Sequence, residues 1–318
     1  MNISKCYRLF ASGLMILTMS TPLYAAYPDK PITLIVAWGA GGATDAMARA
    51  VQPILAKKLG ADIVIKNISG ASGTIGTAEA ANAQPDGYTL LFSASGTLTT
   101  QPHLRTLPYS VDSFEAIGRV AVVSMVTVVT KDSKFNSIND VIAQVKANPG
   151  KLKMASTGAG TIPHLAILSL SKAADIKPGH VPYTSAALAV KAMMGGEVEV
   201  FSDQSQIVSQ FDLKPLAAWS GKRLKEFPDL PTMKELGFDI EISNWVGLFA
   251  PKGTPQAIVD KLATALQQTV EDPALIESMS KLKVQVDFLK LKDFSAYVKN
   301  ESNKNESLLK EAGIIKQQ

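Results

Sequence analysis

Apolar and polar positions divide most of the chain into two kinds of alternating segment. Short apolar runs are typical of strands that are buried on both faces. Longer stretches with an apolar residue every three or four positions are typical of helices. The predicted strands are 32–36, 63–65, 88–92, 152–155, 180–183, 198–201, 215–219 and 284–288. The predicted helices are 44–59, 74–83, 137–147, 163–174, 186–194, 255–270 and 294–312, with another opening at Asp272-Pro273. This alternation predicts an α/β fold with mainly parallel sheets and helices on both faces.

Two longer extended segments interrupt the alternation, at 120–130 and at 240–250. Each is long enough to run from one domain into another. The chain is therefore expected to build a first lobe from 26–125 and 246–318 and a second lobe from 126–245. A double crossover of this kind forms a hinge, and the cleft between the lobes is the expected site.

Several polar residues indicate where helices begin and how they are exposed. Ser137 is a good N-cap for the helix that follows it. Thr232 and Glu235 have the spacing of a capping box, which predicts a short helix ending at Gly237. Thr254 is the expected N-cap before Pro255. The asparagines and serines of 294–312 predict an exposed terminal helix.

The N-terminal segment 1–25 has the pattern of a secretory signal peptide. Lys5 and Arg8 precede an apolar stretch at 9–19, which is too short to cross a membrane as a helix. Cleavage is expected after Ala25, or at a position directly beside it. A membrane anchor is disfavoured by the short apolar stretch, and a lipoprotein by Cys6, which precedes that stretch. The mature protein is therefore expected to be soluble and exported.

Composition excludes several classes of function. Cys6 is the only cysteine, so the mature chain has no thiol for disulfides, metal sites or nucleophilic catalysis. The three histidines, His103, His164 and His180, lack metal-ligand spacing, and we expect no metal. Removal of Lys5 and Arg8 lowers the formal net charge from +4 to +2. There is no basic run with interleaved aromatics, so nucleic-acid binding is not expected.

Three glycine-rich, uncharged loops each follow a predicted strand and lead into a helix. They are 38–45, 67–76 and 155–161. The N-terminus of a helix leaves backbone N–H groups unpaired and carries partial positive charge, and glycine allows close approach. Such loops can hold an anion without a basic side chain. None matches the dinucleotide fingerprint or the P-loop, and we expect no cofactor.

Seven side chains in or near these segments have both a binding and a structural interpretation: Trp38, Asp45, Ser156, Thr157, Thr161, His164 and Asp203. Asp45, for example, either anchors ligand or complements the helix dipole. The hydroxyls either bind ligand or cap helices. No Gly-x-Ser-x-Gly elbow is present and no histidine has an evident acidic partner. We therefore identify no catalytic residue and expect a binding protein and not an enzyme.

The mature chain resembles the Bug family of periplasmic solute-binding proteins, the receptors of tripartite tricarboxylate transporters. The segments that carry the resemblance cover nearly all of it: 27–32, 41–45, 67–76, 85–90, 155–160 with His164-Leu165, 180–183, Gly195-Gly196, 228–232 and 245–251. Their order and spacing are specific. The resemblance implies a two-lobed Venus flytrap fold that closes on a carboxylate and delivers it to a membrane permease.

The resemblance also implies which residues line the site. In the first lobe they are Trp38, Gly41, Gly42, Asp45, Ala71 and Ser72. In the second lobe they are Ser156, Thr157, Gly158, Thr161 and His164, with Tyr183, Thr184 and Asp203 as pocket walls.

The chain departs from the family pattern in ways that bear on the ligand. Ala37 stands where proline is usual, Ile68-Ser69 replaces Arg-Pro, and Ile162-Pro163 precedes His164 where polar residues are usual. Together with Thr184-Ser185-Ala186 in place of Lys-Gly-Ser, they predict a less basic and more apolar pocket. We expect a small organic carboxylate, aromatic or dicarboxylic, bound by a monomer. The alternatives are a ligand-binding subunit for a membrane sensor kinase, and a periplasmic hydrolase or isomerase that uses Asp45 or His164.

Overall fold

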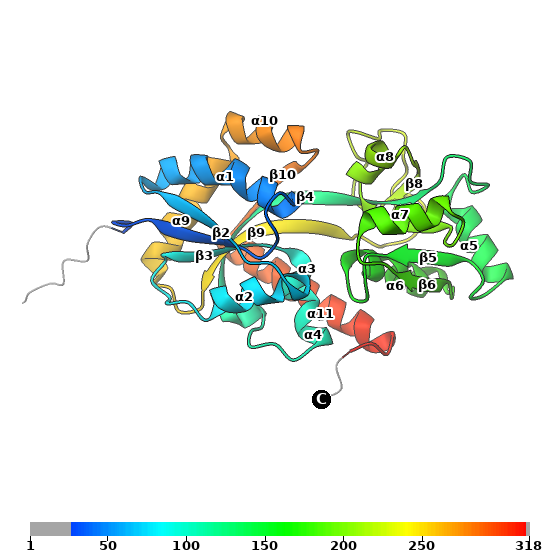
Figure 1. The fold of residues 1–318 in the computed structure, drawn as a ribbon, viewed down its shortest axis with the longest axis horizontal. Helices are drawn as coiled ribbons and strands as arrows, with labels where there is room; N and C mark the ends of the chain where they lie inside the picture. Colours follow the sequence, from blue (N-terminus) through cyan, green and yellow to red (C-terminus); the bar gives the residue numbers. More distant parts are fainter. Residues whose placement is uncertain (1–26, 316–318) are drawn as a thin grey trace, which may run out of the picture.

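One long mixed β-sheet runs through the computed structural model, which describes residues 27–315 (Figure 1). The predicted signal peptide lies outside the described residues. The sheet has the order β2-β1-β3-β9-β4-β7-β5-β6, and β8 and β10 pair with β4 off this path. The strands are β1 (Ile32–Val36), β2 (Ile63–Asn67), β3 (Thr89–Ala94), β4 (Phe114–Val129), β5 (Lys153–Ser156), β6 (Gly179–Pro182), β7 (Val200–Gln204), β8 (Lys214–Ala218), β9 (Ser243–Pro251) and β10 (Gln285–Lys290).

Helices cover both faces of the sheet. They are α1 (Ala43–Leu59), α2 (Thr74–Ala81), α3 (Ser95–Thr99), α4 (Gln101–Leu104), α5 (Ile138–Ala147), α6 (Ile162–Ala174), α7 (Ala186–Met194), α8 (Gln206–Phe211), α9 (Gln256–Val270), α10 (Pro273–Lys281) and α11 (Leu291–Glu311), with single 3₁₀ turns at Ala71–Gly73 and Val111–Ser113. No helix within residues 27–315 combines the length and the apolar character that crossing a membrane requires.

The two predicted crossovers are confirmed as β4 and β9, which pair antiparallel with each other. The first part of β4 also pairs with β10, and the last part with β7 and β8. The pairs β1–β2, β1–β3, β5–β6 and β5–β7 are parallel, as expected for strands joined through helices. The sheet is mixed because the crossover strands run against these parallel sets.

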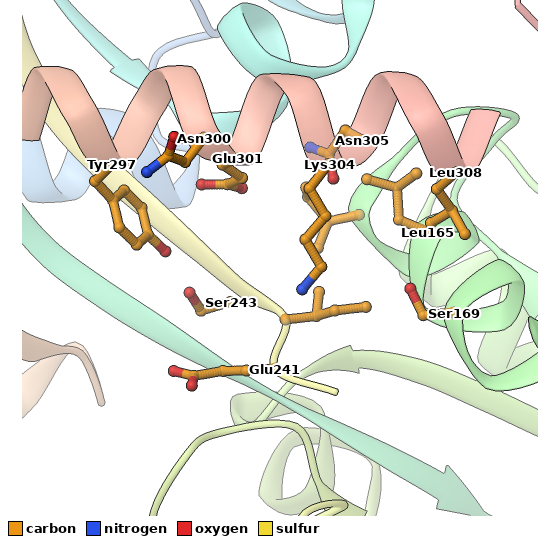
Figure 2. A pocket seen from close by; sticks show the side chains of 12 residues that line it. Leu165, Ser169, Glu241, Ser243, Tyr297, Asn300, Glu301, Lys304, Asn305 and Leu308 are labelled. Atoms are coloured by element: carbon orange, nitrogen blue, oxygen red, sulfur yellow. The ribbon is translucent and has the colours of Figure 1, made fainter. Parts of the chain in front are cut away.

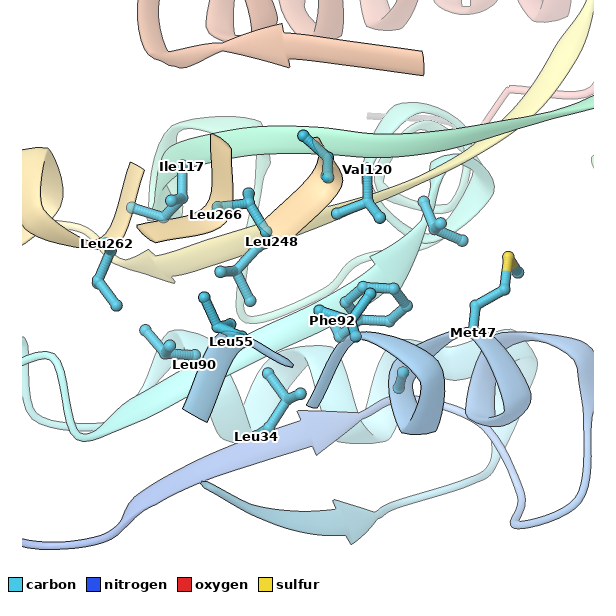
Figure 3. Packing of buried hydrophobic residues seen from close by; sticks show 14 of the residues in the cluster. Leu34, Met47, Leu55, Leu90, Phe92, Ile117, Val120, Leu248, Leu262 and Leu266 are labelled. Atoms are coloured by element: carbon cyan, nitrogen blue, oxygen red, sulfur yellow. The ribbon is translucent and has the colours of Figure 1, made fainter. Parts of the chain in front are cut away.

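The hydrophobic core is divided between the two ends of the sheet. We call the elements around each division the first lobe (β1–β3, β10, α1–α4, α9, α10) and the second lobe (β5–β8, α5–α8). In the first lobe, alternate residues of β1 enter different clusters, Leu34 on the side of α1 and α9 and Ile35 on the other. Figure 3 shows Leu34, Leu55 and Leu248 in the former cluster. The apolar run of β1 therefore reflects burial on both faces.

The terminal helix α11 is less exposed than its polar composition predicts. Phe294 and Val298 are buried in a first-lobe cluster, whereas Leu309 is buried in a second-lobe cluster. Asn305 is also buried and donates to Thr99 Oγ1 at 3.2 Å. The expectation of an exposed helix holds for Asn300, Asn303 and Ser307. It does not hold for Ser302 and Asn305, which are buried against His103 of α4 and Thr99 of α3. The helix packs across both lobes (Figure 1).

The local signals at helix ends were partly right. Ser137 and Asp272 accept backbone N–H groups as N-caps, and these predictions are confirmed. Thr232 and Glu235 form both bonds of the capping box, yet the segment stays a series of turns and not a helix. Thr254 does not cap α9, because its hydroxyl donates to the carbonyl of Pro251 and the N-cap is Pro255.

Candidate functional site

A cavity of about 410 Å³ lies between the lobes and beside the crossover strands. Its lining comes from residues that are far apart in the sequence: Trp38, Ser72, Ala94, Gly96, Thr97 and Gln101 of the first lobe, Met125 and Asn244 of β4 and β9, and Thr157, Gly160, Thr161, Ile162, Pro163, Thr184, Asp203 and Gln204 of the second lobe. We call it the front cavity.

The buried carboxylate of Asp45 fixes the conformation of the first glycine loop. It is 1 % exposed and accepts from the Gly41 N–H at 2.8 Å, from Arg49 Nε at 2.9 Å and from Asn67 Nδ2 at 2.9 Å. The bond from Arg49, followed by those from Gly41 and Asn67, outweighs burial and lowers the pKa of Asp45 to about 2. The carboxylate thus joins the loop, α1 and the end of β2.

The second loop has a backbone that favours glycine. Four successive residues, Gly70 to Gly73, have positive φ angles between 47° and 131°. A Cβ on Gly73 would lie 2.5 Å from Thr97 Cγ2 and 3.1 Å from the carbonyl oxygen of Ala37. The loop therefore packs tightly against the end of the first strand, which brings Ser72 to the front cavity.

His164 and His180 support the third loop. The Gly160 N–H donates to His164 Nδ1 at 2.9 Å, which leaves the proton of the neutral ring on Nε2. The two imidazole rings stack with their centroids 4.0 Å apart. His180 Nε2 lies 2.7 Å from the hydroxyl of Ser156. Burial, and then His180, lowers the pKa of His164 to about 4. His164 therefore orders the loop as a neutral ring.

Helices α2 and α6 begin at the front cavity, and α1 follows the loop that contains the lining residue Trp38. The N-cap residues of α1, α2 and α6 are Gly42, Gly73 and Thr161, and no side chain of the described chain caps these helices. Thr161 donates its hydroxyl to the Gly158 carbonyl instead. Elsewhere in the described chain, α5, α7 and α10 have Ser or Asp side chains as caps, whereas α4, α8, α9 and α11 have no side-chain cap. The backbone donors of the first three helices are therefore left for water or an anion.

Two further polar groups in the lining have unused hydrogen-bonding capacity. Trp38 Nε1 and Gln101 Oε1 are buried without a partner in residues 27–315. Both side chains belong to the front cavity. Buried polar atoms without a partner are rare in proteins, and each marks a position where a ligand or an ordered water can bond.

The predicted site residues fall into two groups. The cavity is lined by Trp38, Ser72, Thr157, Thr161, Thr184 and Asp203. The lining does not include Gly41, Gly42, Asp45, Ala71, Ser156, Gly158, His164 and Tyr183. Several of these order the glycine loops, as described for Asp45 and His164, and direct ligand contact by this group stays a prediction.

Sequence reasoning missed Thr97, Gln101, Met125 and Asn244. The segment from Ser93 to Thr97 was a usable signal, because small polar residues there follow a predicted strand as in the other loops. Gln101 and Asn244 had no local signal. Asn244 accepts from Ser95 Oγ at 3.0 Å, a contact that only the pairing of β9 with β3 creates.

A second cavity of about 300 Å³, the rear cavity, lies between α11 and α6 (Figure 2). Helix α11 contributes Tyr297, Glu301 and Lys304, which lie on the side of the helix that faces the start of β9. Ile162 lines both cavities. Trp245 Nε1 donates to the Glu301 carboxylate. Burial raises the pKa of Glu301 to about 7, although this bond opposes the change. A buried carboxylate of this kind opposes folding at neutral pH.

We expect the substitution Glu301→Gln to stabilise the protein by about 1–2 kcal/mol at pH 8 and to change stability little at pH 4. The folded-state pKa lies above the usual 4.5, so the penalty for ionising Glu301 develops between pH 4.5 and about 7. Glutamine keeps an acceptor for the Trp245 Nε1–H. The expected change in stability is smaller than the pKa difference alone would give, because water has access to the rear cavity. Urea unfolding at both pH values measures it, with Glu306→Gln on the same helix as control. A loss of stability at pH 8 would contradict the prediction.

Comparison with known proteins gives a consistent result. Residues 47–314 match the family described as "Tripartite tricarboxylate transporter family receptor". The chain is 31% identical to protein BugT of Bordetella pertussis, over 88% of this chain and 89% of that protein. Among solved structures, the periplasmic binding protein BugD is 36% identical, with a TM-score of 0.75 over 92% of this chain and all of the other. A TctC solute-binding protein from Polaromonas has a TM-score of 0.80 and 30% identity, over 90% and 99% of the two chains.

Two other similar structures were solved with small carboxylates. R. palustris Rpa4515 with adipate is 27% identical to this chain, with a TM-score of 0.78 over 91% of this chain and 99% of the other. MatC from Rhodopseudomonas palustris with bound malate is 26% identical, with a TM-score of 0.73 over 89% and 100%. The family match, the relatives and the two-lobed α/β fold agree: this chain belongs to the Bug (TctC-type) family of periplasmic solute-binding receptors.

Proposed function

We propose that this protein captures a small organic carboxylate in the front cavity and delivers it to a tripartite tricarboxylate-type permease. The observation that carries the proposal is the pair of uncapped helix N-termini, α2 of the first lobe and α6 of the second, which begin at the cavity. Backbone N–H groups and partial positive charge at these positions favour an anion. The adipate and malate of two similar receptors support a carboxylate as that anion.

The binding residues that we propose are those given above for the first and second lobes, with Gln101 and Asn244 in addition. A ligand that contacts Ser72 and Trp38 on one side and Thr157 and Thr161 on the other bonds fully only when the lobes are close. Differential affinity of this kind shifts the population toward a closed state. Binding and release are then sufficient for the role, and we propose no catalytic step.

The remaining parts of the proposal concern the whole chain. We propose that the segment 1–25 is removed on export, and that the mature protein acts as a monomer. Its lobes consist of 26–125 with 246–318 and of 126–245. The second-lobe core cluster contains residues from Met125 to Ile240, which supports the limits of the second lobe, and it also takes in Leu309 from the end of α11.

The test is the thermal unfolding of the mature protein with a panel of mono- and dicarboxylates, aliphatic and aromatic. A ligand present at 100 times its Kd adds about 2.7 kcal/mol of stability. For a chain of this size we expect the midpoint to rise by about 5 °C or more. If no member of a broad panel raises the midpoint at millimolar concentration, the proposed function is wrong.

Gly96 offers a variant that fills the cavity without damage to the fold. A Cβ at this position would meet only Ile162 Cγ1, at 4.0 Å, and Gly96 lies in α3. We expect Gly96→Leu to abolish the ligand-induced rise, because its isobutyl group takes the volume of the ligand. Its ligand-free midpoint stays unchanged or rises, since leucine favours a helix. Gly96→Ala is the matched control and keeps binding. Normal affinity in Gly96→Leu would place the ligand elsewhere.

A further inference from the structure

Asp203 is the one ionisable side chain that the described chain contributes to the lining of the front cavity. No lysine, arginine or histidine of residues 27–315 lines it. The cavity therefore holds backbone amides that suit one anion, together with one carboxylate that repels a second anion. This charge pattern restricts the ligands that the cavity can accept.

The Asp203 carboxylate is buried, fixed and without a cationic partner in the part of the chain that the structure describes. The residue is 8 % exposed and lies in β7, opposite Val126 of β4. Its Oδ1 accepts from the Gln204 N–H at 2.8 Å, which is the one hydrogen bond that it makes within the described chain. Burial raises the pKa of Asp203 to about 6, against the effect of that bond. At neutral pH the side chain is thus mostly ionised but poorly compensated.

A buried carboxylate is stabilised by a cation that reaches it. The described chain provides none in this cavity, so the cation has to come with the ligand. A dicarboxylate would instead add two negative charges beside Asp203. A ligand with one carboxylate and one ammonium group fits both parts of the lining, and Met125, Ile162 and Pro163 supply apolar surface for its body.

We propose that the front cavity selects carboxylates that carry an ammonium group, and that this group pairs with Asp203. The inference rests on the proposed function, since the ligand carboxylate still binds at the helix N-termini. It narrows the substrate class to amino acids and related zwitterions. Asp203 is then the residue that discriminates against simple mono- and dicarboxylates.

The experiment is calorimetric titration of the mature protein at pH 7.5 with three matched series. Each series keeps one skeleton and changes the substituent at C2 from hydrogen to hydroxyl to ammonium. The first contains propanoate, L-lactate and L-alanine, the second succinate, L-malate and L-aspartate, and the third 3-phenylpropanoate, L-phenyllactate and L-phenylalanine. In any series that binds, we expect the amino member to bind at least tenfold tighter than the other two.

The variant Asp203→Asn assigns this preference to the residue. Asparagine keeps the acceptor for the Gln204 N–H but removes the charge. We expect it to weaken binding of the amino member at least tenfold and to leave or strengthen binding of the unsubstituted acid. Asp229→Asn is the matched control, because Asp229 is an exposed carboxylate of the same lobe outside the cavity lining. Thermal unfolding without ligand checks that both variants fold.

A pH series on the unmodified protein gives a second measurement that needs no variant. Amino-acid affinity is expected to fall as the pH decreases from 7.5 to 5.5, because Asp203 becomes protonated. His164 and His180, beneath the third loop, both have pKa values below their usual range and do not line the cavity. Dicarboxylate affinity that rises over this interval and exceeds that of the amino members would overturn the inference.

The outcomes separate this inference from the proposed function. Tight binding of unsubstituted or hydroxy acids that is unaffected by Asp203→Asn refutes the ammonium site and leaves the carboxylate receptor standing. No binding in any series and none in the broader carboxylate panel refutes both. If the amino members bind most tightly and Asp203→Asn removes this difference in affinity, the ammonium site and the proposed function are both supported.

Discussion

Replacement of Asp45 by alanine is expected to destabilise the protein by about 3 kcal/mol and to weaken ligand binding by about tenfold or more. The substitution removes a carboxylate that is 1 % exposed and accepts three hydrogen bonds. It leaves the Gly41 N–H without its acceptor and removes one of the two acceptors of the Asn67 amide, which also donates to the Trp38 carbonyl. Because Asp45 ties the first loop to α1, its loss also disorders the donors at the start of that helix. Chemical unfolding and calorimetric titration measure the two effects.

The variant Asp45→Asn separates the contribution of the hydrogen-bond acceptor from that of the negative charge of Asp45. It keeps an acceptor but loses the ion pair with Arg49, whose side chain is 55% exposed. We expect a loss of about 1–2 kcal/mol at pH 7, because solvent screens an exposed partner. The folded-state pKa of about 2 lies below the ordinary 3.8, so this contribution is complete above pH 4 and disappears as the pH falls toward 2. An Asp45→Ala protein as stable as the original would show that the contacts do not stabilise the loop.

Replacement of Gly76 by alanine is the second large effect, with an expected loss of about 3 kcal/mol. An added Cβ would lie 2.6 Å from the Ile68 carbonyl oxygen and 3.0 Å from Ala37 Cα. Both neighbours are backbone atoms at the ends of strands, so α2 has to move away from them. This shift would also displace Ser72 from the front cavity and reduce affinity. Thermal unfolding and ligand titration of the variant measure both results.

Gly39→Ala is the matched control for this prediction, because no atom of the described chain lies within 4 Å of a Cβ at Gly39. Its stability is expected to stay within about 1 kcal/mol of the original. Helix propensity alone would make Gly76→Ala stabilising by about 1 kcal/mol, since Gly76 lies inside α2. The sign of the change therefore decides between local propensity and tertiary packing. A more stable Gly76→Ala protein would mean that α2 is not pressed against the two strands.

The residue pattern by itself predicted most strands and the longer helices, but not α3, α4 and α8. The apolar run Ile32–Val36 predicted β1, because a strand that is buried on both faces is apolar at successive positions. The following segment predicted α1, because a helix that is buried on one face has apolar residues at every third or fourth position. The long segments at 120–130 and 240–250 likewise predicted the crossovers that became β4 and β9. The glycine loops and the family resemblance together predicted a site between the lobes.

The tertiary structure alone decided which side chains face the cavity. Asp45 and Thr161 both lie near a helix start, yet Asp45 turns beneath its loop and Thr161 lines the cavity. Asn244 reaches the site only because β9 pairs with β3, a strand that lies far along the chain from it. Likewise, Ser302 and Asn305 of the polar helix α11 are buried because that face of the helix packs against α3 and α4. The direction of a side chain depends on neighbours that are distant in the sequence, and the local residue pattern does not show which residues these are.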